Sequence, residues 1–267
     1  MTSDKNLLVR LNRDYPLGLK GTILELPRDR VIFESVRQRG VWEIEESEFL
    51  AHSLKNSCQQ PASRTALLDI GANTGLVSLQ ALNLAETDNE VFLFEPVPSN
   101  AAAIRRNLGS FKGIHVNVLA LSDKNEKSQI YTEATNRGKT STLNSIISPV
   151  GQIVTDIKLV DTEQFCNEFL TRFDYYIIKC DTEGMDALIL SRIPIRIWKT
   201  VECAVIEVWA LPSVSALDVD KCLSMFEHFN FMSWHSKSCD ELTLKDIKDF
   251  WLSKTSLQKN LFLRRTL

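Results

Sequence analysis

Short apolar runs recur between residues 63 and 267, and most are followed by a turn or by a segment with helical spacing. Most of the runs contain few polar residues, which is typical of strands buried on both faces of a sheet. Strands that alternate with helices are usually parallel neighbours joined by helical crossovers. Seven runs predict strands of one such sheet: ALLDI (66–70), EVFLFE (90–95), IHVNVLA (114–120), DYYIIKC (174–180), ECAVIEVW (202–209), FMSWH (231–235) and KNLFLRR (259–265).

Two segments between these runs carry clear helix signals. SNAAAIRRNLG (99–109) begins with Ser99, a residue type that favours the N-cap, and ends with Gly109. ALDVDKCLSMFEHF (216–229) repeats apolar residues at the spacing of one helix face. Together with the strands, these helices predict an α/β, Rossmann-like fold: a mostly parallel seven-stranded sheet with helices on both faces.

The chain divides near residue 62. Residues 1–62 have a mixed pattern, and a charged stretch predicts a short helix starting near Glu45, within an extension that packs on the main domain. Residues 63–267 hold all seven runs, and a chain that is 44% hydrophobic can bury one full α/β core. Between the third and fourth strands we expect a small strand at SQIYT (128–132) and a polar loop over 132–149.

Charge and composition exclude several kinds of partner. The formal net charge is −3, without the clustered basic face that nucleic-acid binding requires. No segment approaches the roughly 18–20 apolar residues of a membrane span, and the amino terminus lacks the apolar core of a signal peptide. The six cysteines form no CxxC pair and no Cys/His cluster, so a zinc site is not expected and a cytoplasmic location fits best. The pattern does not indicate an oligomeric state.

The stretch DIGANTG (69–75) joins a buried strand to a helix through a turn with two glycines. Glycine allows a sharp turn and lets a ligand approach the backbone, while the helix N-terminus offers free N–H groups. Asp69 is an acid at the end of an apolar strand, where it needs a cationic or hydrogen-bonding partner. The α-amino group of an amino-acid-type ligand would be such a partner.

The second strand ends at Glu95, where a carboxylate can accept both hydroxyls of a ribose. NAD would fit this acid as well, but dinucleotide-binding turns normally read GxGxxG to hold a pyrophosphate. Here Asn73 replaces the middle glycine and the spacing is GxxxG. The turn therefore favours S-adenosylmethionine, which has no phosphate. An NAD-dependent oxidoreductase and a non-catalytic protein that binds S-adenosylmethionine stay open as alternatives.

Four motifs together resemble FkbM-type methyltransferases in order and spacing: DIGANTG (69–75), FEPVPSN (94–100), ALSD (120–123) and IIKCDTEG (177–184). RGVWEIEESEFL (39–50) is similar to the segment that precedes their cofactor domain. The resemblance implies a class I methyltransferase fold that uses S-adenosylmethionine. It also implies O-methylation of a hydroxyl on a sugar, glycan or natural product, so that the partner is a small-molecule or glycan acceptor.

The same resemblance assigns the cofactor contacts. The methionine end is lined by Asp69, Gly71, Ala72, Asn73 and Gly75, and the ribose is held at Glu95 and Pro96. The adenine is flanked by Ala120, Leu121 and Ser122, and Asp181, the acid after the fourth strand, borders the cofactor.

Methylation of a hydroxyl calls for a general base. Lys179 and Asp181 follow the fourth strand at the sheet edge that faces the ligand, and their spacing puts them on one side. Asp181 is the leading catalytic candidate, Lys179 is either its ion-pair partner or catalytic itself, and Glu207 is a further candidate. We expect Glu183 to cap a helix that starts at Gly184. These acids could hold a divalent ion, but no histidine joins them and no metal is assigned.

Overall fold

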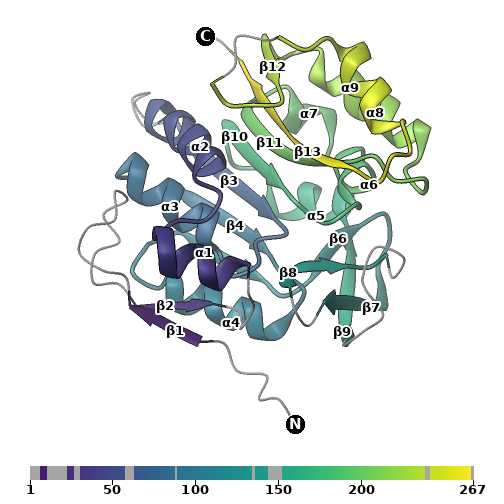
Figure 1. Cartoon of the computed structure of the whole chain (residues 1–267). Coiled ribbons are helices and arrows are strands. Elements are labelled where there is room, and N and C mark those ends of the chain that lie inside the picture. The colour runs from purple at the N-terminus through teal and green to yellow at the C-terminus, as the bar shows by residue number, and fades with distance from the viewer. Residues whose placement is uncertain are drawn as a thin grey trace.

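The computed structural model describes residues 7–10, 23–26, 31–57, 63–87, 89–133, 136–143, 152–237 and 241–265. Their strands form a central seven-stranded sheet, a four-stranded sheet and a two-stranded sheet near the amino terminus (Figure 1). Both large hydrophobic clusters of the core pack on the central sheet, one on each face.

The central sheet has the strand order β12-β13-β11-β10-β3-β4-β5. Its strands are β3 (Thr65–Ile70), β4 (Glu90–Phe94), β5 (Ile114–Asn117), β10 (Tyr175–Cys180), β11 (Val201–Trp209), β12 (Phe231–Ser233) and β13 (Gln258–Arg264). The pairings from β11 to β5 are parallel, whereas β13 is antiparallel to both of its neighbours. The expected mostly parallel sheet is confirmed, and β13 makes it mixed.

The third predicted strand, at 114–120, is wrong at its carboxyl end. β5 stops at Asn117, and the chain turns there, with the N–H of Leu119 donating to the carbonyl of Asn117 at 3.0 Å. Ala120–Ser122 then form β6, which pairs with a strand of the four-stranded sheet. The run 114–120 does not reveal this change of sheet, because the residues on both sides of the turn have similar composition.

The four-stranded sheet has the order β6-β9-β7-β8 and contains β7 (Glu126–Glu133), β8 (Asn136–Ser141) and β9 (Gln152–Asp161). The small strand expected at 128–132 is confirmed and is part of the longer β7, whereas the loop expected over 132–149 is wrong where β8 lies. The sequence of β8 is too polar to predict a strand, and antiparallel pairing with β7 supplies its hydrogen bonds instead. Residues 144–151 of that loop lie outside the described residues.

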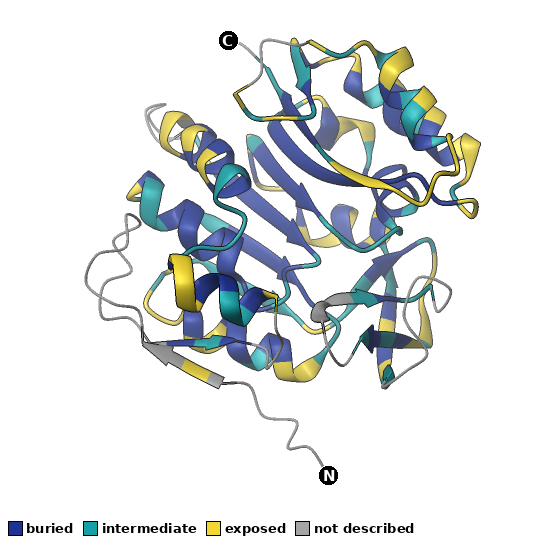
Figure 2. Cartoon of the chain, in the orientation of Figure 1, coloured by how far each residue is buried: buried dark blue, intermediate teal, exposed yellow. Residues whose placement is uncertain are grey.

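Helices cover both faces of the central sheet, as expected (Figure 1). Leu67 and Ile177 point to one face, and Leu68 and Ile178 point to the other, as alternate residues of a strand do. The first face carries α1 (Ile32–Arg39), α2 (Ile44–Ser57), α3 (Leu76–Ala85) and α4 (Pro98–Asn107). The second carries α5 (Thr162–Phe169), α6 (Asp186–Leu190), α7 (Ile195–Trp198), α8 (Ala216–Phe226) and α9 (Leu244–Trp251). Figure 2 shows the buried strands between these layers.

One helix start and one helix length differ from the prediction, whereas the start expected near Glu45 is confirmed by α2. Ser99 does not cap α4: the N-cap is Val97, and Pro98 takes the first helical position, which suits a residue without an N–H. The helix expected near Glu45 is α2, which runs over 14 residues rather than being short.

The amino-terminal segment packs on the rest of the chain through α2, which lies along α3 and shares its hydrophobic core. β2 (Ile23–Leu26) pairs with β1 (Leu7–Arg10), and the amide group of Asn107 bonds both backbone groups of Glu25. No helix within the described part of the chain has the length and apolar character needed to cross a membrane.

The turn between β3 and α3 depends on two glycines with left-handed backbones, Gly71 at φ +80° and Gly75 at φ +75°. A Cβ on Gly71 would lie 1.8 Å from the carbonyl oxygen of Asp181, and a Cβ on Gly75 would lie 2.8 Å from Cδ1 of Leu108. The close neighbour of Gly71 is thus the loop after β10, so the protein's own packing requires this glycine without any ligand.

We expect Gly71→Ala to lower the free energy of unfolding far more than Gly75→Ala. Both substitutions put a side chain on a left-handed backbone, which costs about 1–2 kcal/mol. Only Gly71→Ala also meets a backbone carbonyl, which cannot move aside as the tip of a leucine can. Urea denaturation of the two variants measures the difference, and equal losses would contradict the close approach of the two loops.

Candidate active site

A cavity lies at the carboxyl ends of β3, β4, β10 and β11, the edge of an α/β sheet where ligands usually bind. The turn after β3, Glu95 after β4 and Asp181 after β10 line its inner wall. The four-stranded sheet contributes further lining residues such as Thr142, and the amino-terminal segment contributes Trp42 and Glu43. Segments from the whole length of the chain therefore meet at one site.

Most of the predicted site residues line this cavity: Gly71, Ala72, Asn73, Glu95, Pro96, Ala120, Leu121, Ser122, Lys179, Asp181 and Glu207. Two predicted cofactor contacts, Asp69 and Gly75, do not line it. Asp69 is only 1% exposed, and Gly75 faces Leu108 of the core. A direct contact of either residue with a cofactor stays a prediction.

Glu95 ties the turn after β3 to the turn after β4. It is buried, and its two carboxylate oxygens accept the N–H groups of Asn73 and Val97 at 2.9 and 2.8 Å. Burial raises the pKa of Glu95 to about 7, although these hydrogen bonds favour the ionised form. On the same turn, Oδ1 of Asn73 is buried and accepts no hydrogen bond. This corner of the cavity thus holds acceptor oxygens that a polar ligand could satisfy.

Lys179 joins β10 to β3 beneath the cavity. Its Nζ lies 3.5 Å from Oδ1 of Asp69 and 3.2 Å from Oδ2 of Asp181, and it donates to the carbonyl of Gly71 at 3.0 Å. Burial alone would lower the pKa of Lys179, but the charges of Asp181 and Asp69 raise it well above its ordinary value. The predicted approach of Lys179 to Asp181 is confirmed. Asp69 also accepts a hydrogen bond from Ser78 of α3 at 2.6 Å, so this acid has partners within the protein.

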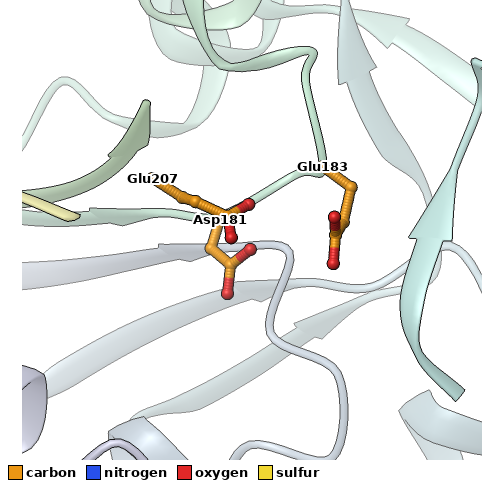
Figure 3. Close-up of side chains that lie close together, drawn as sticks. All are labelled: Asp181, Glu183 and Glu207. Carbon is orange, nitrogen blue, oxygen red and sulfur yellow. The ribbon is translucent and has the colours of Figure 1, made fainter. Parts of the chain in front are cut away.

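Asp181, Glu183 and Glu207 bring carboxylate oxygens within 4.8 Å of one another (Figure 3). Glu207 accepts a hydrogen bond from Nε1 of Trp209 at 2.6 Å and shares another with Asp181. Burial, followed by the negative charge of Asp181, raises the pKa of Glu207 well above its usual range. Glu207 therefore favours its protonated form, in which it can donate to Asp181.

The spacing of these three acids would admit a divalent ion, but their existing interactions do not favour one. The ammonium of Lys179 already lies on one oxygen of Asp181, and Glu207 holds a proton that a metal ligand would have to lose. We therefore assign no metal to the cluster.

Asp186, rather than Glu183, organises the loop after β10. Its carboxylate accepts hydrogen bonds from the N–H of Thr182, the hydroxyl of Thr182 and the N–H of Gly184 at 3.0, 2.9 and 3.2 Å. Burial, together with the charge of Asp181, raises its pKa to about 6. The expected helix from Gly184 capped by Glu183 is wrong: α6 starts at Asp186, and Glu183 turns with φ 52° into the cavity lining.

The sequence did not identify the lining residues of the amino-terminal segment and of β8. Trp42 and Glu43 lie just before α2, and Thr140 and Thr142 lie at the end of β8. A tryptophan and an acid directly before a helix, in a stretch that resembles a family segment, was the available signal for the first pair. The polar sequence of β8 carried no comparable signal.

A family model described as the methyltransferase FkbM domain matches residues 69–231, which is more than half of the chain. The chain belongs to the FkbM methyltransferase family. The resemblance that rests on DIGANTG and IIKCDTEG is thereby confirmed. Membership supports an S-adenosylmethionine-dependent methyltransferase on the class I fold.

No curated protein matches this FkbM methyltransferase. Among solved structures, it is similar to precorrin-6y C5,15-methyltransferase from Geobacter metallireducens, with 14% identity, TM-score 0.33, and coverage of 81% of this chain and 87% of that one. A second is a SAM-dependent methyltransferase from Agrobacterium tumefaciens, with 12% identity, TM-score 0.39, and coverage of 86% and 64%. A third is the fibrillarin pre-rRNA processing protein from Methanococcus jannaschii, with 11% identity, TM-score 0.38, and coverage of 85% and 78%. These likenesses are too distant to bear on function.

We expect Lys179→Met to lower the free energy of unfolding by about 3–5 kcal/mol, because it leaves Asp69 and Asp181 without their buried cation. Adding Asp69→Asn to that variant should restore part of the loss by removing one uncompensated charge. Lys237→Met, which breaks an exposed pair with Glu48, serves as the control and should cost less than about 1 kcal/mol. Chemical denaturation measures all three, and similar losses for the two lysines would contradict the structural role of Lys179.

Proposed function

We propose that this FkbM methyltransferase transfers the methyl group of S-adenosylmethionine to a hydroxyl oxygen of a small molecule or glycan. The proposal rests on one observation: a single cavity has a corner suited to a nucleoside and, beside it, a pair of hydrogen-bonded acids. The turn after β3 and Glu95 form a nucleoside-type corner, and the hydrogen-bonded pair of Asp181 and Glu207 lines the same cavity. Donor and acceptor could therefore meet beside a group that accepts a proton.

The residues of the nucleoside-type corner fit the cofactor. Glu95 presents a buried carboxyl whose ionised form the two ribose hydroxyls would stabilise. Oδ1 of Asn73 is a buried acceptor without a donor, which a polar group of the methionine part would supply. Ala120 and Leu121 line the cavity from β6, in position to flank the adenine.

The charge of the cavity favours this cofactor over NAD. Glu43, Glu95, Asp181, Glu183 and Glu207 all line the cavity, while Lys179 is the one cation among the described lining residues. Lys179 already bridges the buried Asp69 and the partly exposed Asp181, so it offers little to a pyrophosphate with two negative charges. A ligand with a sulfonium and an ammonium group instead brings the positive charge that such a cavity favours.

Bound S-adenosylmethionine supplies a methyl group on a positively charged sulfur. Asp181 accepts a hydrogen bond from the hydroxyl of the acceptor and so aligns the hydroxyl oxygen with the methyl group. Positioning of this kind supplies the larger part of the catalysis. Lys179 and Glu207 hold Asp181 in one orientation from two sides. The hydroxyl proton becomes strongly acidic as the new carbon–oxygen bond forms and the methyl–sulfur bond breaks, so a carboxylate beside the hydroxyl can accept it. Asp181 then holds that proton.

We expect Asp181→Asn to lower turnover by about 10²–10⁴-fold, the range that general-base catalysis usually contributes. Cofactor affinity should stay within a few-fold, because the amide keeps the shape of the side chain and one acceptor oxygen. Rates of methyl transfer and calorimetric titration with S-adenosylmethionine measure the two effects. Glu48→Gln, on the exposed side of α2, is the matched control. Unchanged turnover in Asp181→Asn would remove Asp181 from the reaction.

The acceptor can be found with methyl-labelled S-adenosylmethionine and a fractionated small-molecule extract. We expect the label on an oxygen, as a methyl ether that mass spectrometry and NMR identify. A label on nitrogen or carbon would contradict O-methylation. Failure of the wild-type protein to bind S-adenosylmethionine at high micromolar concentration would instead favour a non-catalytic role.

A further inference from the structure

The segment before α2 is fixed against the cavity by a glutamine of α3. The N–H of Trp42 donates to Oε1 of Gln80 at 3.0 Å, and Nε2 of Gln80 donates to the carbonyl of Trp42 and to the hydroxyl of Ser47. Gln80 is buried, and the hydroxyl of Ser35 in α1 donates to the carbonyl of Val41. The backbone that precedes Glu43 is therefore held by α1, α2 and α3 together.

Glu43 itself has a strained backbone. Its φ is 45°, in the left-handed region, which costs a residue with a side chain about 1–2 kcal/mol relative to its ordinary conformations. The N–H and the hydroxyl of Ser47 both donate to the carbonyl of Glu43, at 3.2 and 3.0 Å, and hold it there. Strain that the surroundings maintain in this way is typical of residues in functional sites.

The side chain of Glu43 lines the cavity among other acids. The charged groups that act on it are Asp181 and Lys179 from β10, Glu46 from α2 and Asp69 from β3. Three of these four are acids, and the single lysine also balances Asp69 and Asp181. Burial first, and the charge of Asp181 next, raise the pKa of Glu43 to about 8, so this carboxyl is largely protonated at neutral pH.

We propose that Glu43 is a further residue of the cofactor site, whose carboxyl faces the positively charged methionine end of S-adenosylmethionine and releases its proton to solvent when that cation binds. The inference rests on the proposed function, since it takes S-adenosylmethionine as the ligand. It gives the amino-terminal segment a role in the site: it carries an acid that stays neutral in the free protein and becomes the counter-charge of the bound cofactor.

Release of the Glu43 proton on binding makes the affinity for S-adenosylmethionine depend on pH. Below pH 8 the free protein holds the proton of Glu43, and the bound cation lowers the pKa of that carboxyl, so binding releases a proton. Release of one proton lowers the dissociation constant about tenfold for each unit of rising pH. Glu95 can add to this release because burial also raises its pKa, to about 7, so the effect of Glu43 must be read as a difference between variants.

Calorimetric titration of S-adenosylmethionine into the full-length protein tests the proposal from pH 6.0 to 7.5. Ionisation of the ligand's own α-amino group is common to all variants and cancels in the comparison between them. Each titration is run in buffers of different ionisation enthalpy, which gives the number of protons released. The variants are wild type, Glu43→Gln, which keeps the shape of the side chain but cannot ionise, and Glu48→Gln. Glu48 is the matched control because it lies five residues further along the chain, in α2, exposed and paired with Lys237.

We expect Glu43→Gln to release fewer protons than wild type, with a pH slope of affinity that is lower by up to one unit. The two proteins should bind alike near pH 6, where Glu43 is protonated in both states, and Glu43→Gln should bind several-fold more weakly at pH 7.5. Glu48→Gln should match wild type throughout. If Glu43→Gln matches wild type in proton release and in slope, the role of Glu43 is overturned while the proposed function stands. If wild type does not bind S-adenosylmethionine at all, both proposals fall together.

Discussion

The site of this FkbM methyltransferase depends on one buried ammonium group. Lys179 stands at the end of β10, in register with Asp69 of β3, and its Nζ contacts Asp69, Asp181 and the carbonyl of Gly71. A buried lysine is stable only when its charge is compensated, and each of the two acids needs the lysine for the same reason. The contact therefore fixes the loop after β10 against the turn after β3. That approach in turn leaves no room for a side chain at Gly71.

The cavity has more acidic side chains than the single positive charge of Lys179 can neutralise. Burial raises the pKa values of Glu43, Glu95 and Glu207, and the charge of Asp181 raises those of Glu43 and Glu207 further, so that an uncompensated buried charge is avoided. A cavity in this state favours a ligand that brings positive charge. The cationic methyl donor of the proposed reaction meets that condition.

The walls of the cavity come from elements outside the central sheet. The four-stranded sheet covers one side, and Ser141 of β8 donates to the carbonyl of Glu183, which joins this sheet to the loop after β10. The amino-terminal segment covers another side through the contacts of Gln80 with Trp42. The carboxyl ends of the central strands thus supply most of the charged lining residues, while the added segments complete the walls of the cavity.

Local pattern was enough to predict the central sheet, its helices and most of the residues at its ligand-binding edge. Apolar runs identify buried strands, and the carboxyl ends of parallel strands meet at one edge of the sheet. The sequence alone therefore predicted that DIGANTG, Glu95 and Asp181 lie close together. Tertiary structure decided the rest. Ala120–Ser122 changed sheets, polar β8 became a strand by pairing with β7, and Asp69 turned to Lys179 and Ser78 away from the cavity. Glu43 reached the site from more than a hundred residues away in sequence from Asp181. Such outcomes depend on which residues, distant in sequence, neutralise a buried charge or pair with a backbone N–H or carbonyl group. The spacing of residues along the chain does not specify these partners.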